Sequence, residues 1–180
     1  MLLQGKSPLN LARHVEQQQT LEGLGEAQNR ILDLLPLLLR EGARASHITR
    51  VVAEINDRVL CKVLQFARAK LGPAPVPYCW VVLGSEGRRE QTFKTDQDNA
   101  LIFADAEDST AAKEYFALLA AFVNDSLETC GYPPCPGNFM ARNPRWQQPL
   151  NIWRSYFREW ITGADRRATE DALILSICVR

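Results

Sequence analysis

Two aspartates, Asp96 and Asp98, stand two positions apart immediately before the apolar run NALIF. Side chains two positions apart in an extended chain point to the same face, so both carboxylates would meet at one point. Such oxygen ligands suit Mg²⁺, and a pair of these ions about 3.5–4 Å apart can activate an attacking hydroxyl and stabilise a departing pyrophosphate. Taken alone, Asp-x-Asp is more often a solvated acidic turn, so this chemistry depends on what stands nearby.

A glycine–serine pair, Gly84 and Ser85, stands upstream of the aspartates and directly follows the apolar run YCWVVL. Glycine lets the backbone turn sharply, so that its amides and the Ser85 hydroxyl can donate hydrogen bonds to a phosphate. Gly-Ser after a strand is usually an ordinary turn. Beside an aspartate pair on the next strand, it predicts a site for a nucleoside triphosphate and Mg²⁺, with Asp96 and Asp98 as metal ligands and catalytic residues.

Three basic residues, Arg88, Arg89 and Lys94, lie in the loop between these two motifs. They are candidate nucleotide-binding residues, because cations on a loop can contact a polyphosphate. Alternatively, Glu86 and Glu90 pair with the arginines and the loop is a solvated charged surface. The sequence has neither the Gly-Lys-Ser/Thr spacing of a Walker loop nor a Rossmann fingerprint.

The elements that must position these residues follow from the spacing of the apolar positions. Three- and four-residue spacing predicts helices, and short runs of β-branched and aromatic residues predict buried strands. Two helices are expected within 9–71, separated near Gly42, with Ser46 as the cap of the second. Further helices are expected at 110–130, capped by Ser109 or Thr110, and at 147–161 and 167–179. The expected strands are 78–83, 99–103 and 139–141. The predicted fold class is α/β (α+β), a small mixed-sheet core with a helical N-terminal arm and a helical C-terminal portion.

The composition narrows the classes of partner. Lysine plus arginine and aspartate plus glutamate both total 21, which argues against wholesale binding to nucleic acid or to an anionic membrane. The five cysteines are an odd, scattered set that favours reduced thiols in a cytoplasmic protein. Cys130 and Cys135, without a second pair or a nearby histidine, make a poor zinc site. No signal pattern is present, and the apolar run 32–39 is too short to span a bilayer.

Residues 84–98, GSEGRREQTFKTDQD, together with the following NALIF, resemble the Gly-Ser to Asp-x-Asp motif of the DNA polymerase beta-like nucleotidyltransferase superfamily. The resemblance is closest to the nucleotidyltransferases of the DUF294 group, which are related to PII uridylyltransferase and glutamine synthetase adenylyltransferase. CPGNFMARNP at 135–144 and the tryptophans Trp146, Trp153 and Trp160 resemble the segment that follows the core in that group. The resemblance therefore covers most of the chain.

This resemblance implies Mg²⁺-dependent transfer of a nucleoside monophosphate from a nucleoside triphosphate to an acceptor hydroxyl. By analogy with the PII and glutamine synthetase modifiers, a protein in signalling or nitrogen regulation is the first candidate acceptor. Longer relatives are expected to carry CBS or cyclic-nucleotide-binding modules. The resemblance also divides the chain into a helical N-terminal region (1–72), a nucleotidyltransferase core (73–145) and the start of a helical substrate-binding region (146–180). This last region is expected to be truncated.

One feature departs from the superfamily pattern, which adds a third carboxylate from another strand. The candidate segment 138–141 has no acid, and Asp105 stands far along the second strand. The alternative is therefore a non-catalytic nucleotide-sensing or partner-binding regulatory module with a degenerate site. A purely structural helical scaffold is a third reading. The nucleotide base, the acceptor and the oligomeric state stay open at this point.

Overall fold

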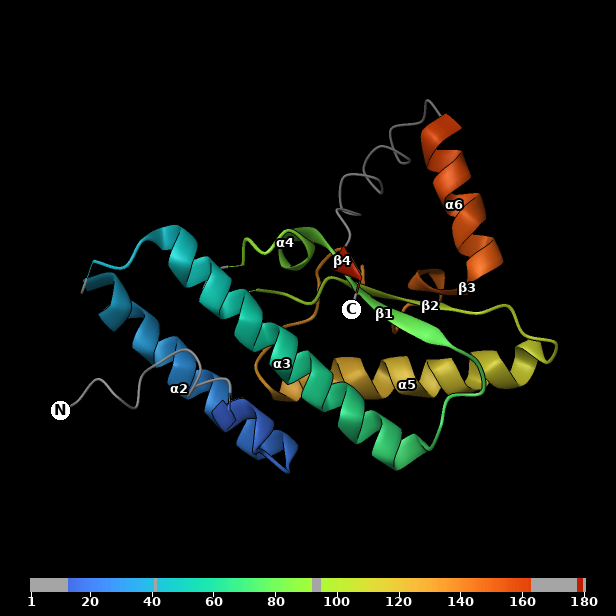
Figure 1. Ribbon diagram of the computed structural model, residues 1–180. Coiled ribbons are helices and arrows are strands. Elements are labelled where there is room, and N and C mark those ends of the chain that lie inside the picture. Colours follow the sequence, from blue (N-terminus) through green and yellow to red (C-terminus); the bar gives the residue numbers. More distant parts are fainter. Residues whose placement is uncertain (1–12, 41, 92–94, 163–177, 180) are drawn as a thin grey trace.

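The computed structural model describes residues 13–40, 42–91, 95–162 and 178–179. Helices and short strands alternate along it, as Figure 1 shows. In chain order the elements are α2 (Leu21–Arg40), α3 (Ala45–Leu71), β1 (Tyr78–Val82), α4 (Gly84–Gly87), β2 (Asn99–Phe103), α5 (Ser109–Thr129), the 3₁₀ turn η1 (Pro144–Trp146), β3 (Gln147–Pro149), α6 (Leu150–Thr162) and β4 (Cys178–Val179). The predicted α/β class is confirmed.

The sheet has the strand order β3-β2-β1-β4 and mixes both pairing directions. β1 pairs antiparallel with β2 and with β4, whereas β2 pairs parallel with β3. In the central pair Trp80 lies opposite Leu101, and Val82 lies opposite Asn99. The end of β1 is therefore next to the beginning of β2, which brings the segments after Val82 and before Asn99 to the same edge of the sheet.

Both faces of the sheet are covered, which explains why its central strands β1 and β2 are largely apolar. Alternate residues Trp80, Val82, Leu101 and Phe103 join the core formed with α3 and α5. The residues between them, with Val81 as an example, join a second core with Trp146 and Trp153. In Figure 1, α3 and α5 run along one face, with α2 beside α3, and α6 stands on the other side. The expectation that the tryptophans pack in a core is met by Trp146 and Trp153, and Trp160 is partly buried against them.

The N-terminal ends of α5 and α3 differ from the predicted caps. α5 is capped by Asp108, whose Oδ1 accepts hydrogen bonds from the amides of Thr110 and Ala111, both at 3.1 Å, rather than by Ser109 or Thr110. An aspartate just before the helix offers a carboxylate oxygen that reaches the first free amides. α3 begins after Arg44 without a side-chain cap, so the expected cap at Ser46 is also wrong.

Three expected elements differ in the structure. Residues 139–141 form no strand, because a turn closed by the Asn143 amide on the Met140 carbonyl bends the chain there. The third strand is β3, so α6 begins at Leu150 and not at position 147. Of the expected helix 167–179, residues 167–177 lie outside the described part, and Cys178–Val179 instead pair as β4 with the open edge of β1.

The described helices include none that is both long enough and apolar enough to cross a membrane.

Replacing Trp153 tests the packing of α6 on the sheet. Its ring is 1% exposed, and its Nε1 donates to the Leu101 carbonyl at 3.2 Å. Trp153→Ala should lower the free energy of unfolding by about 3–5 kcal/mol, as loss of a buried aromatic side chain does. Chemical denaturation followed by circular dichroism measures this. Ile161→Ala on the same helix, where the side chain is 83% exposed, should change it by less than about 0.5 kcal/mol.

Candidate active site

The candidate site lies at the sheet edge where β1 ends and β2 begins. The antiparallel ladder continues one step past the two strands, because the Leu83 amide donates to the Asp98 carbonyl at 2.8 Å. The turn after β1 and the acidic residues before β2 are therefore neighbours. The two motifs that the sequence singled out are brought together as predicted.

Gly84 is the point of closest approach between these motifs. It is buried and adopts a positive φ of 54°, a conformation that glycine accepts more readily than other residues. A Cβ at this position would lie 2.5 Å from Asp98 Oδ2. Only a residue without a side chain lets the carboxylate sit against the turn in this way.

The turn itself is a single helical turn, α4. It is closed by hydrogen bonds from the Gly87 amide to the Leu83 carbonyl at 3.0 Å and from the Arg88 amide to the Gly84 carbonyl at 3.1 Å. Amides that close the turn in this way are occupied. A phosphate that contacts the turn would therefore use the amides before Gly87 or the hydroxyl of the half-buried Ser85.

The two aspartates flank an inward-facing residue. Gln97 is 3% exposed, whereas Asp96 and Asp98 on either side of it are half-buried. One oxygen of each carboxylate and the Cys135 sulfur all lie within 4.8 Å of one another. Burial raises the pKa of Asp98; a hydrogen bond with the Cys135 thiol opposes this, the charge of Asp96 adds to it, and the charge of Arg88 opposes it.

Cys135 is the site residue that the sequence did not indicate, since it was considered there only as part of a poor zinc site with Cys130. It is buried and follows the isolated bridge between Gln97 and Pro134. The Asn138 amide donates to the Cys135 carbonyl at 2.9 Å, and Asn138 has a positive φ of 58°. The Cys-Pro-Gly-Asn stretch signals a turn, but nothing in its spacing indicates that the turn delivers a thiol to the aspartates.

The three candidate basic residues have different surroundings. Arg88 Nε pairs with Glu90 Oε2 at 2.9 Å, which is one of the pairings weighed from the sequence. Arg89 Nη2 instead reaches Asp57 Oδ2 on α3 at 2.8 Å, and the Asp57 side chain is only 10% exposed. Lys94 lies outside the described residues. Contact of any of the three with a nucleotide stays a prediction.

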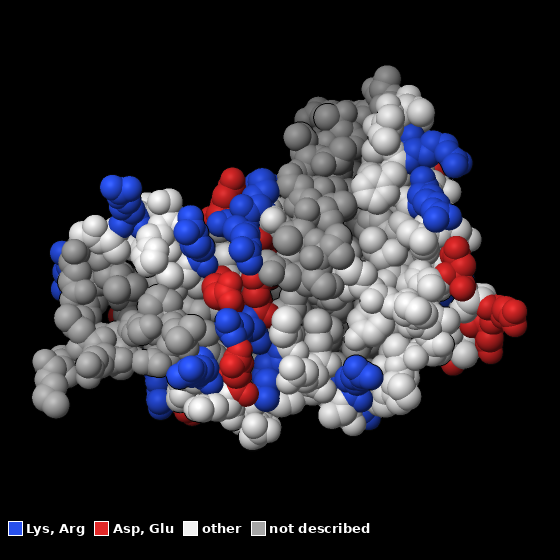
Figure 2. Space-filling view, in the orientation of Figure 1, with Lys and Arg blue, Asp and Glu red and all other residues white. Residues whose placement is uncertain are grey.

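Charges of both signs are interleaved around this edge of the molecule. Figure 2 shows basic and acidic side chains alternating over the region of α3 and α4. This local mixture agrees with the formal net charge of zero. A polyanion would have to be recognised by particular groups and not by a broad basic surface.

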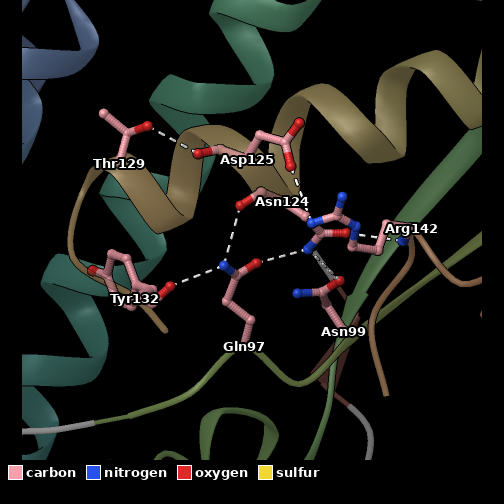
Figure 3. Close-up of polar contacts among 7 residues, drawn as sticks. All are labelled: Gln97, Asn99, Asn124, Asp125, Thr129, Tyr132 and Arg142. Atoms are coloured by element: carbon pink, nitrogen blue, oxygen red, sulfur yellow. Dashed lines mark hydrogen bonds and ion pairs between the residues drawn. The ribbon is translucent and has the colours of Figure 1, made fainter. Parts of the chain in front are cut away.

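Below the aspartates, buried amide side chains form a hydrogen-bond network (Figure 3). Gln97 Nε2 donates to the carbonyl of Asn124 at 3.1 Å and to that of Tyr132 at 2.9 Å. Asn124 Nδ2 donates to Gln97 Oε1 at 2.7 Å and to Asn99 Oδ1 at 3.1 Å. These bonds fix the chain on both sides of Asp98, and with it the direction of the carboxylate.

The same network holds the loop that carries Cys135. Asn99 Oδ1 accepts from the Ala141 amide at 2.8 Å, and Asn124 Oδ1 accepts from the Arg142 amide at 2.9 Å. α5, β2 and the loop before η1 are therefore linked through two asparagine side chains. A buried network whose members are satisfied in this way is rigid and specifies one geometry.

A second buried chain connects the site to α3. The Tyr132 hydroxyl donates to Asn56 Oδ1 at 2.7 Å, and Asn56 Nδ2 donates to Gln91 Oε1 at 2.5 Å. Burial raises the pKa of Tyr132 far above its usual value, and the nearby Glu86 charge adds to this, so its hydroxyl remains a donor. α3 thus positions both the residues after α4 and the loop after α5.

A small cavity with both polar and apolar lining residues lies beneath the turn. Its volume is about 10 Å³, and its lining includes Asn56, Trp80, Glu86, Asp96 and Tyr132. A space of this size holds about one water molecule. A nucleotide would therefore have to lie on the outer side of the aspartates and not within the core.

Comparison with models of protein families finds a match that covers most of the chain. A family model described as "Putative nucleotidyltransferase DUF294" matches residues 29–167, which is more than half of the 180 residues. The matched range includes the Gly84 turn, both aspartates and Cys135. No curated protein matches the chain.

Gly84→Ala should destabilise the protein more than the same change at another glycine of positive φ. At Gly84 the new methyl group meets Asp98, whereas at Gly42, with a φ of 84°, it meets nothing within 4 Å among the described residues. Both variants incur the backbone cost of about 1–2 kcal/mol, and only Gly84→Ala also displaces a carboxylate. Equal losses in the free energy of unfolding for the two variants would contradict the close packing of Gly84 on Asp98.

Asn124→Leu tests the buried network. It removes the partner of Gln97 and Asn99 and leaves buried polar groups unsatisfied, which costs about 1–3 kcal/mol for each group. The adjacent change Asp125→Asn breaks the exposed ion pair of Asp125 Oδ1 with Arg142 Nη1 at 3.1 Å. That change should cost no more than about 1 kcal/mol. Denaturant titration should therefore show a clearly larger loss in the free energy of unfolding for Asn124→Leu than for Asp125→Asn. Similar losses would mean that the network contributes little to stability.

Proposed function

The chain belongs to the DUF294 family of nucleotidyltransferases, and from this membership and the site geometry we propose that it moves a nucleoside monophosphate from a nucleoside triphosphate to an acceptor hydroxyl. Asp96 and Asp98 would hold Mg²⁺ for this reaction. The observation that carries the proposal is the contact of Gly84 with the Asp98 carboxylate. It places a turn suited to phosphate directly against a pair of acids suited to a metal ion.

The donor set fits a divalent cation. Two carboxylates and a thiol converge within 4.8 Å, and within the described part of the chain neither aspartate forms an ion pair with lysine or arginine. Like charges placed this close repel each other unless a cation lies between them. A bound Mg²⁺ would neutralise triphosphate charge and stabilise the pyrophosphate as it leaves.

The residues of the chain have distinct roles in this reaction. Asp96 and Asp98 hold the cation, and the Ser85 hydroxyl with the first amides of α4 binds the distal phosphates. Arg88, close enough to Asp98 to influence its pKa, would exchange its pairing with Glu90 for an outer phosphate oxygen. The acceptor hydroxyl loses its proton to solvent as its oxygen forms a bond to the α-phosphorus, the bond to the bridging oxygen breaks, and pyrophosphate departs.

We infer that the acceptor is a hydroxyl on a protein, in signalling or nitrogen regulation, and that the protein works in the cytoplasm. Relatives that modify PII and glutamine synthetase support the first inference. The second is supported by Cys130 and Cys135, which form no disulfide within the described part of the chain, because a reducing compartment keeps cysteines in this state.

One observation favours a second candidate function. The group beside the two aspartates is the thiol of Cys135, and not the third carboxylate that the resemblance to the superfamily leads us to expect. A site of that composition is compatible with a regulatory module that binds a nucleotide without transferring it. Binding and transfer must therefore be measured separately.

Calorimetric titration with ATP, GTP, CTP and UTP, each with and without Mg²⁺, tests the binding step. Asp96→Asn/Asp98→Asn should weaken Mg²⁺-dependent binding by more than the roughly 10–100-fold that loss of an outer partner of a metal ligand costs. Glu107→Gln/Glu114→Gln removes the same charge at exposed positions and should leave binding unchanged. A folded wild-type protein that binds none of the four nucleotides would contradict the proposal.

Transfer is measured with a nucleotide labelled at the α-phosphate. Protein-bound label that depends on Asp96 and Asp98 supports the transferase, whereas Mg²⁺-dependent binding without label in any acceptor supports the regulatory module. Label found on RNA in place of protein would overturn the inferred acceptor class.

A further inference from the structure

We propose that Cys135 Sγ is the third protein ligand of the metal ion that Asp96 and Asp98 hold, and that the site therefore accepts sulfur-seeking divalent ions such as Zn²⁺ and Cd²⁺. This inference rests on the proposed function for the existence of a metal there, and it assigns a role to a residue outside the two motifs. It differs from a zinc site built on Cys130 and Cys135, because Cys130 faces the Leu21 carbonyl instead.

The distances suit one shared ion. The two carboxylate oxygens and the sulfur lie within 4.8 Å of one another. Ligand bonds to such ions are about 2.0–2.3 Å long, so two ligands of one tetrahedral ion stand about 3.3–3.8 Å apart. The three atoms would therefore have to move slightly closer together when an ion binds.

Burial and the hydrogen bond with Asp98 raise the pKa of the Cys135 thiol, so a cation has to displace its proton, whereas two backbone hydrogen bonds act in the opposite direction. Cys135 Sγ receives hydrogen bonds from the backbone amides of Phe139 and Gly137. Outer hydrogen bonds of this kind orient a metal ligand and support its charged form. The turn also requires glycine at position 137, because a Cβ there would lie 2.8 Å from the Phe139 ring and 3.7 Å from the Cys135 sulfur.

The charge of this donor set explains how a thiol can replace an acid. Two carboxylates and one thiolate carry the same total charge as three carboxylates. In the metal-free site the S–H group hydrogen-bonds with Asp98. Coordination replaces this S–H bond by an S–metal bond and releases the proton to solvent. Sulfur favours softer ions over Mg²⁺, so the substitution alters ion preference and not charge.

The test is a titration of the full chain with Cd²⁺, followed by ultraviolet absorption, because a thiolate bound to Cd²⁺ gives a charge-transfer band. The wild type should show this band, and Cys61→Ser, which removes an exposed thiol, should keep it. Cys135→Ser and Asp96→Asn/Asp98→Asn should each lose it, with Cd²⁺ affinity lowered by more than about tenfold. A band that persists in Cys135→Ser, or in the aspartate variant, would overturn the proposal.

Cys135→Asp provides a second variant that does not depend on the loss of a signal. It creates an all-carboxylate set, so it should bind Mg²⁺ more tightly and Cd²⁺ less tightly than the wild type. Unchanged preference between the two ions would contradict a role for the sulfur.

The two proposals fail in different ways. If nucleotide binding requires Mg²⁺ and the aspartates but no absorption band requires Cys135, the sulfur ligand is refuted and the proposed function is retained. If the absorption band requires Cys135 and the aspartates but no nucleotide binds, the metal site is retained and the proposed function is refuted.

Discussion

The geometry of the site depends on Gln97 pointing into the protein. Its amide bonds to the carbonyls of Asn124 and Tyr132 and accepts from the Asn124 side chain, so it cannot leave the core without leaving these groups unsatisfied. Because neighbouring side chains in an extended segment alternate, Asp96 and Asp98 must then face outward together. A slip of one residue would bury an aspartate in place of the glutamine, and burying an unpaired carboxylate is far more costly than burying a satisfied amide.

The helices therefore do more than cover the sheet. Asn124 on α5 and Asn56 on α3 carry the hydrogen bonds that hold β2, the Tyr132 loop and the segment after α4. Arg89 adds an ion pair to Asp57 on α3, which fixes the far end of the α4 turn. Most of these links use neutral amides and a hydroxyl, so they add no charge beside the two aspartates.

The sequence was sufficient for the parts of the site that are local. Gly84, Asp96 and the two central strands were predictable because a turn, a two-residue period and an apolar run each depend on near neighbours. Cys135 was not, because its loop is placed by hydrogen bonds that join residues 18 and 42 positions apart. The strand β3 was missed for a related reason: the sequence Gln-Gln-Pro has no strand character of its own, and it becomes extended by pairing with the edge of β2.

A thiol also suits the buried position better than a third carboxylate would. Burial already raises the pKa of Asp98, and the neighbouring Asp96 adds to that effect, so the metal-free protein holds two acids against an electrostatic penalty. A third carboxylate at the more deeply buried Cys135 would increase this penalty, whereas a protonated thiol is neutral and hydrogen-bonds with Asp98. The third negative charge then develops only when the cation binds, so the metal-free protein does not have to bury it.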